Sequence, residues 1–157
     1  MTLTPIGRAR ETGWTVFVAE AERIEQLPQL LSLPCPRFVL LLADAQGRSP
    51  DAILGELLDR GCVYLCAWGA ACEQTHDNMD DVVLEREIKG APEQTIMTTW
   101  HDKESLDEAV DFALRHARPD DALVPGCDAV VLAAIGSPEW ARELHGIAQH
   151  SLLPPVL

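Results

Sequence analysis

The chain is poor in basic residues: 12 Lys and Arg stand against 25 Asp and Glu, for a formal net charge of −13. Nucleic-acid binding depends on Lys and Arg that neutralise phosphates, so this composition argues against a nucleic-acid partner. The negative charge is concentrated, because residues 72–111 hold 12 acidic side chains and only three basic ones. Such a stretch is either a solvated face that aids solubility, a surface for a basic protein partner or a cation site.

The chain also lacks a long hydrophobic run. No apolar stretch approaches the ~20 residues of a membrane helix, and the N-terminal segment MTLTPIGRARETGW has no signal-peptide core. We therefore expect a cytoplasmic protein with no membrane partner. The five cysteines agree with this expectation, because an odd number without a signal peptide favours buried, reduced thiols over disulfides.

The length of 157 residues is that of a single domain, to which residues 1–12 and 151–157 would add terminal extensions. Five apolar runs have the length of strands, and several are nearly continuous. Such runs are typical of strands that are buried on both faces, as in parallel sheets. The five predicted strands are residues 14–20, 37–45, 62–69, 95–101 and 129–136.

Helix signals separate these runs. Ser49 and Pro50 predict an N-cap and a first helical residue for a helix over 49–61, and Ser137 begins a similar helix over 137–150. Ser105 and Glu108 form a capping-box pattern at the start of a helix over 105–117. A more polar helix near 70–84 and a short one near Pro28 complete the set.

The alternation of strands and helices predicts one α/β domain. We expect a three-layer sandwich of the Rossmann or flavodoxin type, with about five mainly parallel strands and helices on both faces. Two strand orders stay open, 2-1-3-4-5 and 3-2-1-4-5.

The carboxyl ends of the strands are where such a fold would bind a ligand. If the third and fourth strands are neighbours, the segments CAWGAACEQTHD and TTWHD lie side by side at that edge. Trp68, Gly69 and Trp100 are then candidates for a ligand or cofactor site. The alternative is that the two aromatic side chains close the core.

The richest cluster of reactive side chains comprises Cys72, His76 and Asp80, which share one helix face by their i, i+4 and i+8 spacing. His101 is expected to approach them from the next strand. These four residues are candidate metal ligands, although their spacing matches no zinc motif. Cys72, activated at a helix N-terminus with His76 or His101 as its base, is a candidate nucleophile. The alternative is a packed thiol and a surface histidine.

Phosphate-binding motifs are missing. The chain has neither G-x-G-x-x-G nor a Walker-type glycine loop. Only the Gly136-Ser137 turn ahead of a helix offers an anion site, and Ser-Pro starts of this kind usually serve as caps.

Two segments carry a family resemblance: CVYLCAWG followed by CEQTHD, and TTWHDKESLDEAVDF. The region 62–112 resembles a small bacterial family of unknown function that has Cys-x-Trp-Gly, Cys-Glu-x-x-His-Asp and Thr-Thr-Trp-His segments. The residues that match include Cys66, Glu73, Asp77, Thr98 and Thr99. This resemblance implies no activity.

From the sequence we therefore expect an interaction module that uses the acidic surface over 72–111, with a basic protein or a second copy of the chain as its partner. The alternative is a metal- or thiol-dependent enzyme built on Cys72, His76 and His101. A third hypothesis, a small-ligand sensor, depends on fold analogy alone. No cofactor is assigned.

Overall fold

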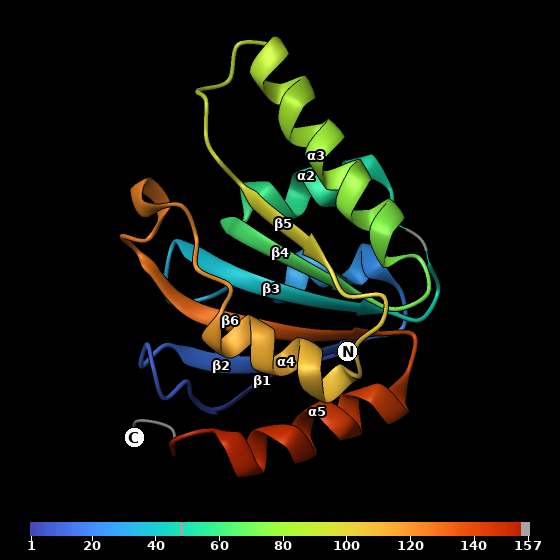
Figure 1. The fold of residues 1–157 in the computed structure, drawn as a ribbon. Helices are drawn as coiled ribbons and strands as arrows, with labels where there is room; N and C mark the ends of the chain where they lie inside the picture. Colours follow the sequence, from blue (N-terminus) through green and yellow to red (C-terminus); the bar gives the residue numbers. More distant parts are fainter. Residues whose placement is uncertain (48, 155–157) are drawn as a thin grey trace.

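A single sheet of six strands organises the part of the chain that the structure describes (Figure 1). The computed structural model describes residues 1–47 and 49–154. The order across the sheet is β1-β2-β6-β3-β4-β5. β1 pairs with β2 in antiparallel fashion, and every other neighbouring pair is parallel. The strands are β1 (Thr2–Arg8), β2 (Thr15–Ala21), β3 (Arg37–Asp44), β4 (Cys62–Trp68), β5 (Met97–Trp100) and β6 (Cys127–Ile135).

The α/β class and all five predicted strands are confirmed, and these five run parallel. Both strand orders that the sequence left open are wrong. The last strand, β6, lies between β2 and β3, so the five predicted strands have the order 1-5-2-3-4. β6 is buried along nearly its whole length, which its apolar run AVVLAAI requires because a central strand is covered on both faces.

The sixth strand, β1, was not predicted, since residues 1–12 were expected to be a terminal extension; Pro5 and Gly7, residues that strands seldom contain, lie within it. An edge position tolerates both, since the open side of an edge strand needs no ladder bonds. The β1–β2 register shifts between these two residues. β1 also anchors the C-terminal tail: Arg8 N donates to Leu153 O at 2.9 Å, and Leu153 N donates to Arg8 O at 3.0 Å. Of the predicted extension 151–157, residues 155–157 lie outside the described part of the chain.

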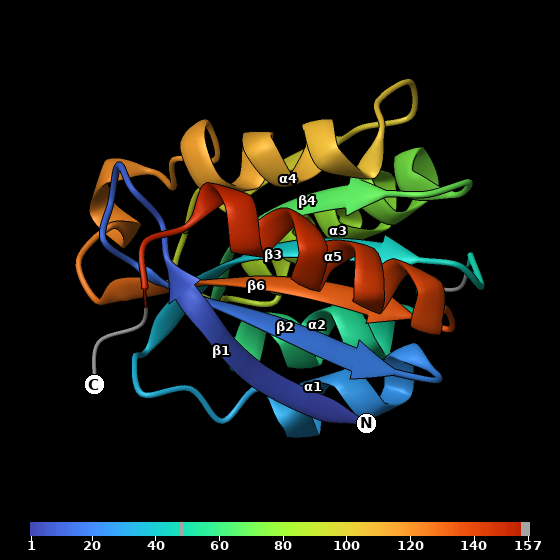
Figure 2. The same ribbon diagram turned by 90° about the horizontal axis from the view of Figure 1, so that it is seen from below.

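Helices cover both faces of the sheet (Figure 2). α1 (Leu27–Leu30), α2 (Asp51–Asp59) and α3 (Cys72–Ile88) pack on one face, and α4 (Leu106–Arg115) and α5 (Pro138–Ser151) pack on the other. Short 3-10 turns occupy Ile24–Gln26 and Asp121–Leu123. In β3, Leu40 faces the first layer and Leu41 the second, as strand alternation requires. No helix in the described ranges is long and apolar enough to cross a membrane.

The helix starts follow the predicted caps in two of three cases. Ser105 Oγ accepts from Glu108 N, and Ser137 Oγ accepts from Trp140 N, each at 3.1 Å. Ser49 is not a cap, because α2 begins one residue later with Pro50 in the N-cap position. The Ser49 hydroxyl instead lies 2.5 Å from the hydroxyl of Thr75 on α3.

Candidate functional site at the β4–β5 edge

The two segments singled out in the sequence lie side by side. β4 and β5 are parallel neighbours with Ala67 opposite Trp100, and His101 N donates to Ala67 O at 2.9 Å. The Trp68-Gly69 turn and the Trp100-His101 segment therefore share the carboxyl edge of the sheet, as the sequence predicted (Figure 1).

His76 belongs to the α3 side of β5. Its ring lies against Trp100, with centroids 4.5 Å apart. His76 Nδ1 lies 2.9 Å from Asp77 Oδ1, and its Nε2 lies 3.6 Å from Asp80 Oδ2. Asp80 also accepts a hydrogen bond of 2.7 Å from the Thr98 hydroxyl. These contacts fix α3 against β5.

His101 belongs to the opposite side. Its ring is buried and packs on Phe112 of α4, with centroids 4.6 Å apart. His101 Nε2 lies 2.9 Å from Thr99 Oγ1, and its Nδ1 lies 2.9 Å from Glu104 Oε2. Both ring nitrogens thus have protein partners. Thr99 belongs to the Thr-Thr-Trp-His segment that the sequence singled out, but neither it nor Glu104 was expected to be a partner of His101.

The sheet itself separates the two histidines. Trp100 and His101 are consecutive residues of one extended segment, so their side chains point to opposite faces. His76 and Asp80 lie with Trp100, whereas the imidazole of His101 lies with α4. Across residues 1–47 and 49–154, no group of three or more His, Cys, Asp or Glu side chains is arranged to hold a metal ion. The structure thus does not bring Cys72, His76, Asp80 and His101 together as one ligand set.

Cys72 is the first residue of α3, as the nucleophile hypothesis requires, but its thiol is buried. Burial raises the pKa of the Cys72 thiol, and this outweighs the hydrogen bond that the backbone of His101 offers to its sulfur. The expectation that the helix N-terminus lowers this pKa is therefore wrong, because desolvation disfavours the thiolate more than the helix end favours it.

All five cysteines are free thiols, and four of them are buried. Burial raises the pKa of Cys62 to about 12 and that of Cys127 to about 11. The pKa values of Cys35 and Cys66 are also raised, chiefly by burial. These side chains therefore act as small apolar residues of the core at neutral pH.

We expect these thiols to make the protein alkali-sensitive. In the unfolded chain they ionise near the ordinary pKa of 9.0, whereas the folded state keeps Cys62 protonated to about pH 12. The contribution of Cys62 and Cys127 to stability is thus complete below pH 9 and is lost as pH rises toward the folded pKa, by at most about 1.4 kcal/mol per pH unit for each of these two thiols. Urea unfolding at pH 8, 9.5 and 10.5 measures this slope. A Cys62→Ala variant should show a smaller slope, and equal slopes would contradict the expectation.

Two candidate ligand residues have structural roles at this edge. Trp68 Nε1 donates to Glu104 O at 2.8 Å. The rings of Trp68 and of Trp140 on α5 pack edge to face, with their centroids 4.7 Å apart. Gly69 has a φ of +119°, and a Cβ there would lie 2.9 Å from Asp44 O. Trp68 thus joins β4 to the segment before α4 and to α5, and Gly69 allows the turn to pass close to the end of β3.

The remaining candidate, Trp100, is exposed together with three other large apolar side chains near β5. The exposed fractions are 42% for Trp100, 37% for Met97, 55% for Leu84 and 77% for Ile88. On α3, residues 76, 80, 84 and 88 succeed one another at i+4, and each such step turns the position by about 40° around the helix. Leu84 therefore still lies near the side that carries His76 and Asp80, whereas Ile88 points further away from β5. Neither Leu84 nor Ile88 was expected to be exposed from the sequence, although two apolar side chains in a polar helix were the signal.

An acidic hollow lies on α4 and the segment before it, and two of its residues, Glu104 and Phe112, contact His101, which follows β5. It is open, has a volume of about 450 Å³, and has carboxylates around the ring of Phe112. The residues that line this acidic hollow are Glu104, Asp107, Glu108, Asp111, Phe112 and His116. Four of the 12 acidic side chains of residues 72–111 therefore line a hollow beside the end of β5.

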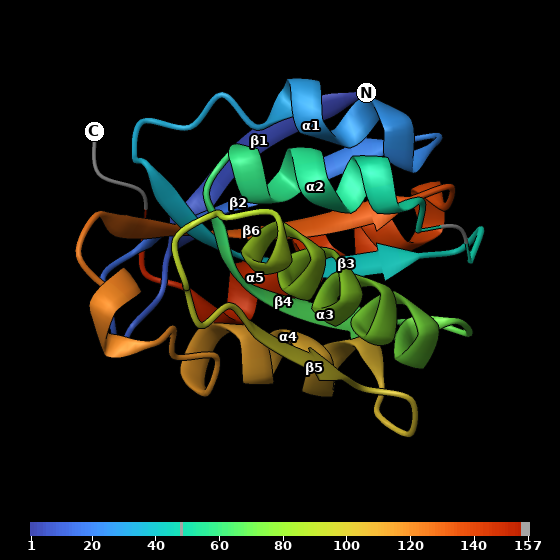
Figure 3. The ribbon, with the colours of Figure 1, turned by 90° about the horizontal axis from the view of Figure 1, so that it is seen from above.

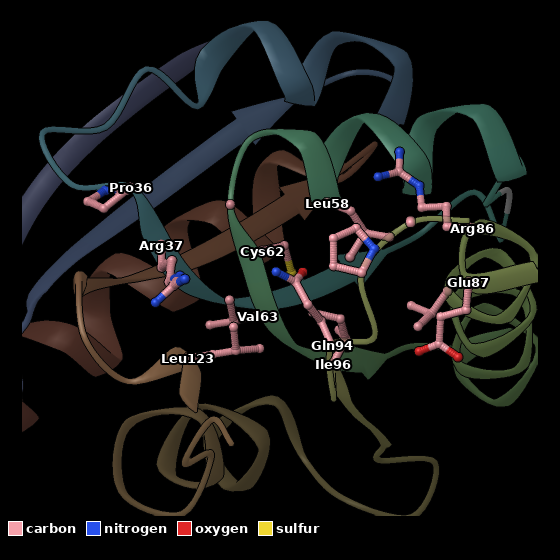
Figure 4. A pocket seen from close by; sticks show the side chains of 14 residues that line it. Pro36, Arg37, Leu58, Cys62, Val63, Arg86, Glu87, Gln94, Ile96 and Leu123 are labelled. Atoms are coloured by element: carbon pink, nitrogen blue, oxygen red, sulfur yellow. The ribbon is translucent and has the colours of Figure 1, made fainter. Parts of the chain in front are cut away.

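A separate cavity of about 310 Å³ lies at the amino ends of β3 and β4 (Figure 4). Cys62, Val63 and Leu123 supply buried apolar lining. Arg86 on its rim is already engaged, because it donates to Asp59 Oδ1 at 2.9 Å and to Gly55 O at 2.8 Å. The sequence predicted ligand sites only at the carboxyl ends of the strands, so this cavity was not expected.

The chain belongs to a family described as a domain of unknown function, DUF7684, whose model matches residues 16–150. The match covers every element from β2 through nearly all of α5, including the β4–β5 edge. A comparison with curated proteins finds no match.

Proposed function

We propose that this protein is a binding module for a basic protein partner, and that its contact surface surrounds the β5 edge. One observation carries the proposal: the excess of acids over bases in 72–111 is exposed on both sides of an edge strand that also exposes apolar side chains. A surface that carries acidic side chains alone aids solubility. A surface on which charged side chains surround apolar and aromatic ones is typical of protein recognition sites. The helices on both faces support the Rossmann-like or flavodoxin-like arrangement for the scaffold.

Charge reversal tests this proposal, and the structure decides which acids to change. Asp77 and Asp80 hold His76 and Thr98, so their reversal would disturb the fold. Asp81 on α3 and Asp102 after β5 are both exposed. We expect Asp81→Lys with Asp102→Lys to lose a partner that the wild-type protein captures from cell extract, by tenfold or more, with an unchanged Tm.

A matched control reverses Asp128 and Glu143, which are exposed residues of β6 and α5. This double variant makes the same change in net charge at a distance from β5. It should capture the partner as the wild-type protein does. Equal capture by both double variants, or equal loss from both, would refute the proposed surface.

A further inference from the structure

We infer that the partner contributes an extended segment, alternating in basic and apolar residues, which pairs with the open side of β5 as an additional strand. This inference depends on the proposed function and specifies how the acidic surface binds. In the described ranges no strand lies beyond β5, which is the last strand of the sheet. In the view onto this edge of the sheet, β5 runs beside α3 and in front of α4 (Figure 3).

The backbone of β5 has groups available for such pairing. Because His101 N donates to Ala67 O, and the direction of these groups alternates along a strand, those of Thr99 and Met97 also point toward β4. The amide and carbonyl groups of Thr98 and Trp100 therefore point to the open side, where an edge strand can accept another strand about 4.8 Å away.

The two sides of β5 require different side chains of the added strand. On the α3 side, the strand would meet Trp100 and, on α3, the exposed Leu84, which favours apolar residues. On the α4 side, it would meet the acidic hollow, where Lys or Arg finds carboxylates around the ring of Phe112. Successive side chains of a strand point to opposite faces, so the partner segment alternates apolar with basic residues.

The negative charge around β5 favours a basic partner over a second copy of the chain. Pairing two β5 edges would bring together two stretches that each hold 12 acids and three bases. Like charges across an interface oppose association, whereas a basic segment is attracted. A heterologous basic segment is therefore the favoured occupant.

A defined peptide tests the inference: Lys-Val-Lys-Val-Lys-Val-Lys, with Lys-Lys-Lys-Lys-Val-Val-Val as its composition-matched control. We expect the alternating peptide to bind at least tenfold more tightly in calorimetry. Bound peptide should slow amide hydrogen exchange at Thr98 and Trp100. The amides of Thr99 and His101, which face β4, should show little change.

Thr98→Pro removes an outward amide without touching the β4 ladder, and should weaken the alternating peptide at least tenfold. Thr98→Val serves as its control, because it loses only the hydroxyl bond to Asp80 and should still bind. If Thr98→Pro does not fold, hydrogen exchange at the Thr98 and Trp100 amides of the wild-type protein, with and without the alternating peptide, tests the strand pairing.

Four results would overturn the inference. Equal binding of both peptides, with loss on Asp81→Lys and Asp102→Lys, would leave the acidic surface as a partner site but exclude strand pairing. No binding of either peptide, or binding without protection of Thr98 and Trp100, would also exclude strand pairing, and the capture experiment would still test the proposed function separately. Concentration-dependent self-association that protects the same two amides would make a second copy the occupant.

Discussion

Replacing Gly61 with alanine should lower the free energy of unfolding by more than about 3 kcal/mol, because two costs combine there. Gly61 joins α2 to β4 with a φ of +109°, and a Cβ at this position would lie 2.0 Å from the carbonyl oxygen of Pro36. The obstacle is backbone, so no side chain can move aside. Gly61 O also accepts from Phe38 N at 3.0 Å, which ties this turn to the start of β3.

Gly90 provides the control for this prediction. Its φ of +97° is similar, but nothing lies within 4 Å of the place that a Cβ would occupy. Gly90→Ala should therefore lose only the conformational term, about 1–2 kcal/mol. Urea unfolding of both variants distinguishes the cost of the backbone conformation from the cost of the steric clash. Equal losses of unfolding free energy in the two variants would show that the clash with Pro36 is relieved without cost.

Replacing Trp68 with alanine is the second change from which we expect a large loss of stability, about 3–5 kcal/mol. The indole fills the space between the end of β4 and α5, where it meets Trp140 at 4.7 Å. Trp68→Phe keeps an aromatic ring but loses the hydrogen bond to Glu104 O, so it should cost only about 0.5–1.5 kcal/mol.

The measurement for Trp68 is urea unfolding of the two variants beside the wild-type protein. It distinguishes the two interpretations that the sequence left open for this residue. A tryptophan that forms the wall of a ligand site is dispensable for folding, so Trp68→Ala would then keep the wild-type free energy of unfolding. That outcome would contradict the structural role described above.

Local sequence signals correctly predicted those helix starts and strands that depend only on residues close together in the chain. The Ser105 and Ser137 caps and the five apolar strands are of this kind, because a cap needs a hydroxyl within one turn and a buried strand needs a continuous apolar run. The cap at Ser49 was wrong, since a hydroxyl near a helix start can equally bind a neighbouring helix, here through Thr75.

The candidate site was predicted in part. The sequence correctly brought Trp68 and Trp100 to one edge, since the carboxyl ends of neighbouring parallel strands coincide. It did not separate His76 from His101, because the face that each side chain takes depends on where the helices pack. The burial of Cys72, which reverses the expected shift of its pKa, is likewise a result of packing.

By itself, the sequence determined the class of the fold, the positions of most strands and helices, and the concentration of negative charge in 72–111, because all three depend on residues close together along the chain. Only the tertiary structure decided that β6 enters the centre of the sheet, that β1 pairs with β2 at one edge, and that β5 is the other edge, with acid and apolar surface around it. The physical reason is that strand order and exposure depend on contacts between residues far apart in the chain, for which no local pattern exists.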